Sequence, residues 1–436
     1  MGRTLAAKIL ARAAGRAAVE EGELVTCRVD LVMLHDSGGP RRVAPILERL
    51  GVRPWDPTRI VLVSDHYAPA VDAESARILD LTRRWGREHG VARHYDMVGI
   101  CHIVLAEHGH VRPGMFVVGG DSHTPTAGAF GAFAMGVGAS EMAAVLATGE
   151  IWLEVPQTMR ILLEGVPGRA VVAKDVMLAL CRRLGLGGAD YRVVEYAGPG
   201  LAAFDAEERL TLANMAAELG GITGLIEPDA RTAAFLGGLG VELAPEELAR
   251  WRSDPDAPVA SELRLDLTGL APQVAAPHSP ADAAPVDEVE PAPIDQAYLG
   301  ACTGAKLADL RMAARVLRGR RVAARTRLLV APASARVWRE AAADGTLATL
   351  VEAGAILLPS GCGACAGYGA GLLAEGETCI ASTARNFKGR MGAASARVYL
   401  ASPYTVAASA VAGRICDPRP LLAEPAGSAD EELRGG

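Results

Sequence analysis

Residues 119–141 read GGDSHTPTAGAFGAFAMGVGASE, and they directly follow the apolar run Met115–Val118. This order predicts a buried strand that ends in the polar letters DSH, with a helix beginning near Ser140. In α/β proteins strands alternate with helices, and ligands gather at the carboxyl ends of parallel strands. The sequence therefore predicts an α/β fold with mainly parallel sheets and a functional site in strand-end loops.

The same succession of apolar run, polar or Gly-rich loop and helix recurs along the chain. Further buried strands are predicted at 59–63, 160–163, 327–330 and 354–358, and helices at 307–317 and 335–343. At roughly 150 residues per domain, 436 residues predict about three domains. We expect them at 1–155, 156–275 and 276–436, with a Pro/Ala-rich linker at 271–293 and a loose tail after Asp417.

The composition excludes several classes of protein. Hydrophobic residues make up 50% and charged residues 22% of the chain, which excludes a disordered protein. The net charge of −7 argues against general binding to nucleic acid or membrane surfaces, and no apolar stretch approaches the ~20 residues of a spanning helix. Eight cysteines are too few for a disulfide scaffold, which predicts a cytoplasmic location. Only four of the 44 basic residues are lysine, so a lone arginine says little about function.

Three of the cysteines stand in a pattern that suggests chemistry. Cys302 lies in GACTG, and Cys362 and Cys365 form a CGAC motif, each after a predicted strand. Backbone N–H groups in such turns favour thiolates, and three thiolates suit iron–sulfur chemistry, whereas structural zinc usually has a fourth Cys or His ligand. Packed thiols and a thioredoxin-like disulfide between Cys362 and Cys365 stay open as alternatives. The remaining cysteines are predicted to lie in the core: Cys27, Cys101, Cys181, Cys379 and Cys416.

Several histidines fall beside carboxylates in predicted loops. Asp65 precedes His66, Asp121 lies two residues before His123, and His102 follows in GICH. A carboxylate can fix the tautomer of a histidine and raise its pKa, as a general acid requires. Each motif alone is more often a helix-capping Asp beside a histidine that is satisfied within its loop.

Two further sets of polar residues follow. Asn214 and Glu218 are four residues apart and so are expected on one face of a helix, an ordinary spacing by itself. Arg385 and Arg390 flank a glycine turn in RNFKGR. Arginine binds carboxylates in bidentate fashion, but a solvated basic loop is an equally open interpretation.

Taken together, these segments resemble the aconitase superfamily, and most closely the large subunit of 3-isopropylmalate dehydratase and its homoaconitase relatives. The resemblance covers nearly the whole chain, and the 60-residue step from Cys302 to Cys362 belongs to it. It implies three α/β domains of the aconitase type, without the swivel domain. The ten ordered segments are TLAAKILARAAG, VDLVMLHDSGGP, SDHYAP, GICH, GGDSHTPTAGAFGAFAMGVGASE, NMAAELG, GACTGAK, GCGACAG, ARNFKGR and SPYTVAASAVAGRI.

The resemblance also implies a chemistry. A 4Fe–4S cluster would be held by Cys302, Cys362 and Cys365, with one iron open to water or substrate. The enzyme would be a hydro-lyase that isomerises a 2-hydroxy dicarboxylate of the 3-isopropylmalate type, as in leucine biosynthesis, by dehydration and rehydration. By this resemblance, His66 with Asp65 would donate a proton to the departing hydroxide, and Glu218 would take part in catalysis near the open iron. The histidine network would be supported by His102, Asp121 and His123. Substrate would be bound by Ser122, Asn214, Arg385 and Arg390.

The swivel domain of this family carries the catalytic base and a further arginine, and only 22 residues follow Arg414 in this chain. The resemblance therefore implies a separate small subunit that closes over the site, with the isolated chain inactive or nearly so. Gly304 and Ala384 stand where the family usually has Asn. We expect these exchanges to alter hydrogen bonds near the cluster or the room for substrate.

Other functions stay open at this point. Within the same class, the substrate could be homoaconitate or another alkylmalate of a specialised pathway. In a different class, the chain could be a non-catalytic, cluster-bearing or RNA-binding regulator, although its acidic balance argues against RNA. A thiol–disulfide oxidoreductase would give Cys302 no role.

Overall fold

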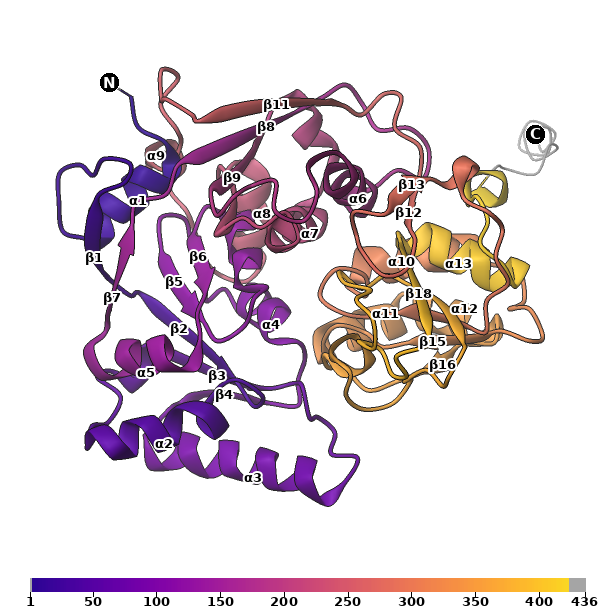
Figure 1. The fold of residues 1–436 in the computed structure, drawn as a ribbon, viewed down its shortest axis with the longest axis horizontal. Coiled ribbons are helices and arrows are strands. Elements are labelled where there is room, and N and C mark those ends of the chain that lie inside the picture. Colours follow the sequence, from indigo (N-terminus) through magenta and orange to yellow (C-terminus); the bar gives the residue numbers. More distant parts are fainter. Residues whose placement is uncertain (1, 423–436) are drawn as a thin grey trace, which may run out of the picture.

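Three mainly parallel β-sheets organise the structure, a computed structural model that describes residues 2–422. The first two sheets and their helices form one side of the molecule, and the third sheet forms the other (Figure 1). The predicted alternation of strands and helices around parallel sheets is confirmed. Within residues 2–422, no helix combines the length and the apolar character that crossing a membrane requires.

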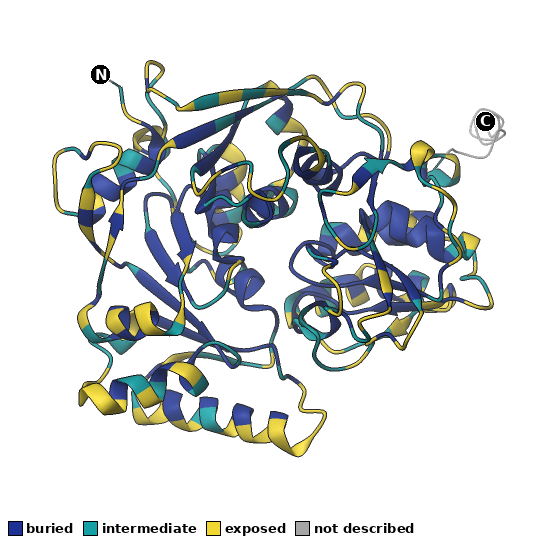
Figure 2. Cartoon of the chain, in the orientation of Figure 1, coloured by how far each residue is buried: buried dark blue, intermediate teal, exposed yellow. Residues whose placement is uncertain are grey.

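The first sheet has five parallel strands in the order β4-β3-β2-β5-β6. Its central strands β2 and β3 are buried at every position, as the continuous apolar runs LVMLH and IVLVS require when helices cover both faces. Figure 2 shows these strands in dark blue, while the outer face of α3 is exposed. The elements are α1 (Leu5–Ala13), β1 (Leu24–Arg28), β2 (Leu31–His35), α2 (Pro40–Leu50), β3 (Ile60–Ser64), α3 (Ala73–Glu88), β4 (Arg93–Asp96), α4 (Cys101–Glu107), β5 (Phe116–Gly119), the 3₁₀ helix η2 (Thr124–Phe130), β6 (Phe133–Gly136), α5 (Ala139–Thr148) and β7 (Glu150–Glu154), which pairs with β1.

The second sheet has four parallel strands in the order β10-β9-β8-β11. The alternating burial of β8 shows that one of its faces is less covered than the other. Its elements are β8 (Thr158–Glu164), α6 (Ala173–Leu184), β9 (Val193–Ala197), α7 (Ala206–Asn214), the 3₁₀ turn η4 (Met215–Ala217), β10 (Thr223–Ile226), α8 (Ala230–Gly237), α9 (Pro245–Arg250) and β11 (Ser261–Asp266).

The third sheet has seven strands in the order β13-β12-β18-β17-β14-β15-β16. The strands from β18 to β16 are parallel, and β12 is antiparallel to both of its neighbours. Its elements are β12 (Gln273–Ala275), β13 (Ala283–Pro285), β14 (Gln296–Leu299), α10 (Leu307–Leu317), β15 (Arg327–Val330), α11 (Ala335–Ala343), α12 (Thr346–Glu352), β16 (Ile356–Leu357), the 3₁₀ helix η6 (Gly363–Ala366), β17 (Thr378–Ala381), β18 (Arg397–Ala401) and α13 (Pro403–Ala412).

The predicted linker at 271–293 is wrong, because this segment contributes two strands to the third sheet. β12 pairs with β13 and β18, and Val274 and Ala275 are fully buried. Short strands built of alanine and proline leave little apolar pattern in a sequence, which explains the error. We propose domain boundaries near residue 155 and ahead of Gln273, since β12 pairs within the third sheet.

Two predicted helices are confirmed, and one predicted strand is shorter than expected. The helices expected at 307–317 and 335–343 have those bounds in α10 and α11. The strand expected at 354–358 is reduced to β16 at the sheet edge, and Ile356 is 51% exposed rather than buried. Of the tail predicted to be loose, Arg419–Leu422 form a 3₁₀ turn, and residues 423–436 lie outside the described part of the chain.

Replacing Glu107 with Gln should stabilise the protein at alkaline pH. Glu107 ends α4 and accepts a hydrogen bond of 2.9 Å from Ser334, the N-cap of α11, across two parts of the fold. Burial raises the pKa of Glu107 to about 7, although Ser334 acts in the opposite direction. The folded protein therefore loses stability as the pH rises from the ordinary range of a carboxyl through 7, and an amide, which also accepts from Ser334, avoids that loss.

We expect the midpoint of thermal unfolding of Glu107→Gln to exceed that of wild type by about 2 °C at pH 8 and to match it at pH 5. The exposed Glu48→Gln serves as the control and should change neither value. A Glu107→Gln protein that is less stable than wild type at pH 8 would contradict the burial cost.

Candidate active site

The parts of the fold built around the first and third sheets meet at one cavity of about 380 Å³. Loops at the carboxyl ends of β2, β3, β5, β14 and β17 contribute its walls, as expected for parallel sheets. Ten predicted site residues line the cavity: His66, His102, Asp121, Ser122, His123, Cys302, Cys362, Cys365, Arg385 and Arg390. The other three, Asp65, Asn214 and Glu218, lie behind them and hydrogen-bond to lining residues.

Glycines shape the loop that carries Asp121 and His123. A Cβ on Gly119 would lie 2.1 Å from Thr124 Oγ1, and a Cβ on Gly136 would lie 2.4 Å from the carbonyl oxygen of Asp121. Thr124 Oγ1 donates to that same carbonyl over 2.6 Å. The loop can therefore fold tightly against β6 only because both positions are glycine. This requirement explains two of the glycines in the sequence 119–141.

The three predicted cysteines face the cavity as free thiols, and Cys302 and Cys365 are buried. Asn214 Nδ2 donates to Cys302 Sγ at 3.1 Å. Among residues 2–422, the ligand groups whose atoms lie within 4.8 Å of one another contain no cysteine. Sulfurs about 2.3 Å from a tetrahedral zinc would lie within about 4 Å of one another. The three thiols, as they stand, therefore do not all lie at the mutual distances that a single zinc ion requires.

Asp65 and His66 form a buried pair at the end of β3. Their Oδ1 and Nδ1 atoms are 2.7 Å apart, and Asp65 Oδ2 accepts from the backbone N–H of Cys101 at 2.8 Å. Burial alone would lower the pKa of His66, but the carboxylates of Asp65, Asp36 and Asp121 together more than offset it and raise the pKa to about 10. His66 can therefore remain protonated at neutral pH and present Nε2 as a donor to the cavity.

Asp121 joins the other two predicted histidines. Its Oδ1 lies 2.8 Å from His102 Nε2 and also accepts from the backbone N–H of His123 at 2.8 Å. Its Oδ2 lies 4.0 Å from His66 Nε2. Burial raises the pKa of Asp121, but the bond from His102 and the charge of the histidines hold it well below its usual value. Asp121 is therefore an anion between three histidines.

Glu218 and Arg385 extend this network to the second and third sheets. Glu218 Oε1 lies 3.0 Å from His123 Nε2 and accepts from Arg385 Nε at 2.6 Å, while Arg385 Nη1 donates to Ser122 Oγ at 2.9 Å. Burial opposes ionisation of Glu218, yet His123 and Arg385 lower its pKa to about 2. These bonds orient Arg385 while leaving its guanidinium partly exposed at the cavity.

The predicted helical face of Asn214 and Glu218 is wrong in detail. α7 ends at Asn214, the 3₁₀ turn η4 follows, and Glu218 comes after that turn. The tighter turn nevertheless directs both side chains toward the first sheet, where Asn214 bonds Thr126 and Glu218 bonds His123. The two residues therefore lie near each other, but a 3₁₀ turn rather than one helical face brings them together.

The loop from Arg385 to Arg390 is not simply a solvated basic loop. Its tip is exposed at Phe387 and Lys388, but both arginines turn inward and line the cavity. Arg390 Nε is buried and has no hydrogen-bond partner among residues 2–422. His102 Nδ1, Asn214 Oδ1 and Glu218 Oε2 share this property. Buried polar atoms normally have partners, so the site has room for ligands, water or a further chain.

The two unusual residues have clear surroundings. A Cβ on Gly304 would lie 2.1 Å from Ser382 Oγ, so Ser382 fills the space that a larger side chain would need. Ala384 is buried and lines the cavity. Ser382 Oγ therefore occupies the space beside Gly304, where it bonds backbone atoms of Gly300 and Gly304. At Ala384 the cavity wall is apolar.

Other polar residues near the site escaped the sequence analysis, and three of them line the cavity: Ser37, Arg42 and Tyr368. His35 stacks on His66 with ring centroids 4.2 Å apart, and the Asp36 carboxylate accepts the backbone N–H of His66 at 3.0 Å. The letters HD after the apolar run 31–34 carried the same signal as the DH of Asp65 and His66. Lys174 and Lys306 are both buried near Cys302. The sequence around each lysine does not predict this position.

The five predicted core cysteines mostly behave as expected. Cys27, Cys101, Cys181 and Cys379 are fully buried, whereas Cys416 is only half-buried. Cys101 begins α4 and also lines the cavity, and its backbone N–H donates to Asp65 Oδ2.

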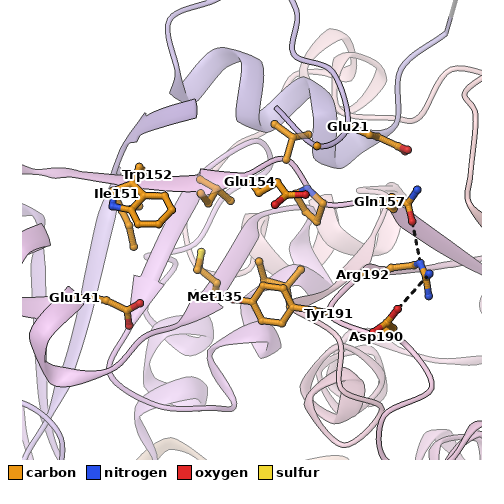
Figure 3. A pocket seen from close by; sticks show the side chains of 15 residues that line it. Glu21, Met135, Glu141, Ile151, Trp152, Glu154, Gln157, Asp190, Tyr191 and Arg192 are labelled. Carbon is orange, nitrogen blue, oxygen red and sulfur yellow. Dashed lines mark hydrogen bonds and ion pairs between the residues drawn. The ribbon is translucent and has the colours of Figure 1, made fainter. Parts of the chain in front are cut away.

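A larger cavity of about 720 Å³ lies elsewhere, between β7 and the loop before β9 (Figure 3). Four carboxylates line it, from Glu21, Glu141, Glu154 and Asp190, against the single cation Arg192, which already bonds Gln157 and Asp190. Such walls repel anions, so the smaller cavity with Arg385 and Arg390 is the better site for a carboxylate substrate.

Comparison with known proteins finds extensive similarity. The model of the aconitase family (aconitate hydratase) matches residues 7–293 and 287–413. The 3-isopropylmalate dehydratase large subunit 1 of Methanopyrus kandleri is 47% identical, over 97% of this chain and 100% of its own length. The probable methanogen homoaconitase large subunit of Methanothermobacter thermautotrophicus is 44% identical, over 94% of this chain and 96% of its own. The crystal structure of Thermococcus kodakaraensis aconitase X aligns with a TM-score of 0.49 at 12% identity, over 83% of this chain and 84% of that one.

Proposed function

The chain belongs to the aconitase family, and from this premise we propose that it is the large subunit of a two-subunit hydro-lyase. The reaction is the isomerisation of a 2-hydroxy dicarboxylate of the 3-isopropylmalate type, by dehydration and then rehydration at the neighbouring carbon. One observation carries the proposal: the three predicted cysteines, a protonated histidine and three arginines, Arg42 among them, face the same cavity. A metal ligand set, an acid and carboxylate-binding groups are the parts that this reaction needs.

The donor set fits a 4Fe–4S cluster, which Cys302, Cys362 and Cys365 would hold. The thiols are free, the three do not all lie within 4.8 Å of one another, and Asn214 already donates to one sulfur. When bound, such a cluster supplies a Lewis-acidic iron that polarises the substrate hydroxyl. Three thiols must stay reduced for this purpose, which favours a reducing compartment such as the cytoplasm.

The histidines supply and hold protons. His66 carries a proton at neutral pH and presents Nε2 to the cavity, where it can protonate a departing hydroxide. Asp65 fixes the ring through Nδ1, and His35 packs against its face. Asp121, His102 and His123 form an ordered polar wall that can position water beside the reacting carbon.

The arginines recognise the substrate. Arg385 is held by Glu218 and Ser122, and Arg390 brings a buried, unpartnered Nε to the same cavity. A dicarboxylate can therefore bind through bidentate contacts with its reacting hydroxyl beside the cysteines. Ser122 completes the polar wall, and Asn214 supports it from behind through Thr126 and Cys302.

The carboxylates Asp65, Asp121 and Glu218 are each bound to histidine or arginine and so are poorly suited to act as the catalytic base. We propose that a separate small subunit supplies the base and closes the cavity. The relatives named large subunits support this division, and so do the unpartnered polar atoms at the site.

The substrate is the finer part of the proposal. Relatives named for isopropylmalate and for homoaconitase are nearly equally similar, at 47% and 44% identity. The apolar patch at Ala384 favours an alkyl group over a third carboxylate at that wall. We therefore place 3-isopropylmalate first and homoaconitate, or another alkylmalate, second.

The test combines the anaerobically reconstituted chain with a candidate small subunit and follows the absorbance of the unsaturated intermediate. The substrates compared are 2-isopropylmalate, homocitrate and citrate. We expect turnover of 2-isopropylmalate by the two chains together and almost none by either chain alone. Turnover of homocitrate alone would move the assignment to the second candidate. A complex that binds iron but turns over none of the three would favour a non-catalytic, cluster-bearing regulator.

A further inference from the structure

Two buried lysines flank the loop that carries Cys302. Lys174 and Lys306 are each 1% exposed, in a chain with only four lysines. Fully buried ammonium groups are costly unless they are paired. Their surroundings therefore show what each charge is for.

Lys306 has its own counter-charge. Its Nζ lies 2.6 Å from Asp309 Oδ2 and also donates to Thr211 Oγ1 at 3.0 Å. The backbone of Lys306 begins α10, where the Asp309 carboxylate also accepts its N–H. Lys306 therefore forms a buried ion pair with Asp309, and this pair caps the N-terminus of α10.

Lys174 has no such partner. It enters from α6 of the second sheet, which packs against β12 and β13 of the third (Figure 1). Its Nζ donates to the carbonyl oxygens of Thr383 at 2.6 Å and Ser382 at 3.0 Å, and to Thr303 Oγ1 at 3.1 Å. Among residues 2–422, no carboxylate lies within ion-pair distance of Lys174. Its three hydrogens are satisfied, but its charge is not.

The acceptors of Lys174 belong to the two loops that build the site. Thr303 follows Cys302 directly, and Thr383 lies two residues before Arg385. Thr303 Oγ1 in turn donates to the Ser382 carbonyl at 3.0 Å. One ammonium thus ties the cysteine loop to the arginine loop.

Burial lowers the pKa of Lys174 to about 8, and the groups whose negative charge acts against this are Glu218 and, when ionised, Cys302 and Cys365. Glu218 is already bound to His123 and Arg385. The three cysteines carry negative charge only as thiolates, the form in which they bind metal. A loaded site would therefore provide the counter-charge that Lys174 lacks among the described residues.

We infer that Lys174 is a positioning residue for the metal centre: its ammonium balances the charge of the three-cysteine assembly and holds the Cys302 and Arg385 loops together. The inference rests on the proposed function, because it requires a thiolate-bound cluster in this cavity. Groups that surround a metal site in this way commonly change metal affinity by about 10- to 100-fold when they are replaced.

The experiment measures iron retention rather than activity. Wild type, Lys174→Met, Lys174→Gln and Lys8→Met are reconstituted anaerobically with iron and sulfide, and iron loss to a chelator is followed by visible absorbance. Lys8 pairs with Asp254 on the surface, so Lys8→Met is the matched control. We expect both Lys174 variants to lose iron about tenfold faster than wild type, and Lys8→Met to behave as wild type. Thermal unfolding of the metal-free proteins is measured alongside.

The outcomes separate the alternatives. If Lys174→Met lowers the unfolding temperature of the metal-free protein but loses iron at the wild-type rate, the lysine only supports the fold and the inference is wrong. If Lys174→Gln, which keeps hydrogen-bond donors, retains iron as wild type does, the charge has no role and the inference is also wrong. Should Lys174→Met fail to fold, Lys174→Gln decides alone. A wild-type protein that binds no iron overturns the proposed function itself, and the wild-type sample reports that result independently.

Discussion

Replacement of Cys302 by serine is expected to lower kcat of the two-subunit enzyme by about a thousandfold, because Lewis-acid stabilisation is worth several kcal/mol and each 1.4 kcal/mol is a factor of ten. The same change should remove most of the iron, since Cys302 is one of only three thiols at the cavity wall that we assign to the cluster. Both effects have one physical origin. A hydroxyl is a poorer, harder ligand than a thiolate.

Cys379→Ser is the matched control for this experiment. Cys379 lies fully buried in β17, next to β14 in the same sheet, but it does not line the cavity. Its replacement should leave iron content and kcat close to those of wild type. Full activity of Cys302→Ser with a full complement of iron would show that the ligand assignment is wrong.

The second large effect concerns the proton on His66. His66→Gln is expected to lower kcat by about 10²- to 10⁴-fold, the usual contribution of a positioned acid. Asp65→Asn should act differently, through the pH profile. The charged groups that face His66 are Asp65, Asp36 at 3.8 Å and Asp121 at 4.0 Å, while His35 stacks on its ring.

Asp65 contributes most to the raised pKa of His66, which is about 10 despite burial. An acid works only while it is protonated, so wild-type kcat should persist through neutral pH and fall as the pH approaches 10. Without the Asp65 charge, burial lowers that pKa, and the alkaline decline of Asp65→Asn should move toward or below neutral pH. The measurement is kcat against pH at equal iron content. An alkaline limb in Asp65→Asn at the wild-type position would exclude His66 as the acid.

Sequence reasoning located most of the site for an identifiable reason. Carboxyl ends of parallel strands meet at one edge, so polar letters after apolar runs, such as Asp65-His66 and Asp121-Ser122-His123, were expected together. The structure does bring them together, with Arg385 and the three cysteines. The resemblance to the aconitase family, first stated from ten short segments, is confirmed by the family match over most of the chain.

What escaped prediction depends on contacts between distant parts of the chain. Lys174 reaches Thr383 across 209 residues, and its own segment AKDVMLALCRRL predicts only the start of a helix. The 3₁₀ turn between Asn214 and Glu218 and the strand β12 are likewise set by packing against other sheets. Local periodicity carries no information about such partners.

Hydration chemistry in this cavity is expected to depend on iron held by Cys302, Cys362 and Cys365. The most direct test of this dependence is anaerobic removal of iron from the active two-subunit complex in steps, with iron content and turnover of 2-isopropylmalate measured on each sample. We predict that turnover falls in proportion to iron and returns when iron and sulfide are restored. Undiminished turnover by a complex that holds no iron would contradict the account.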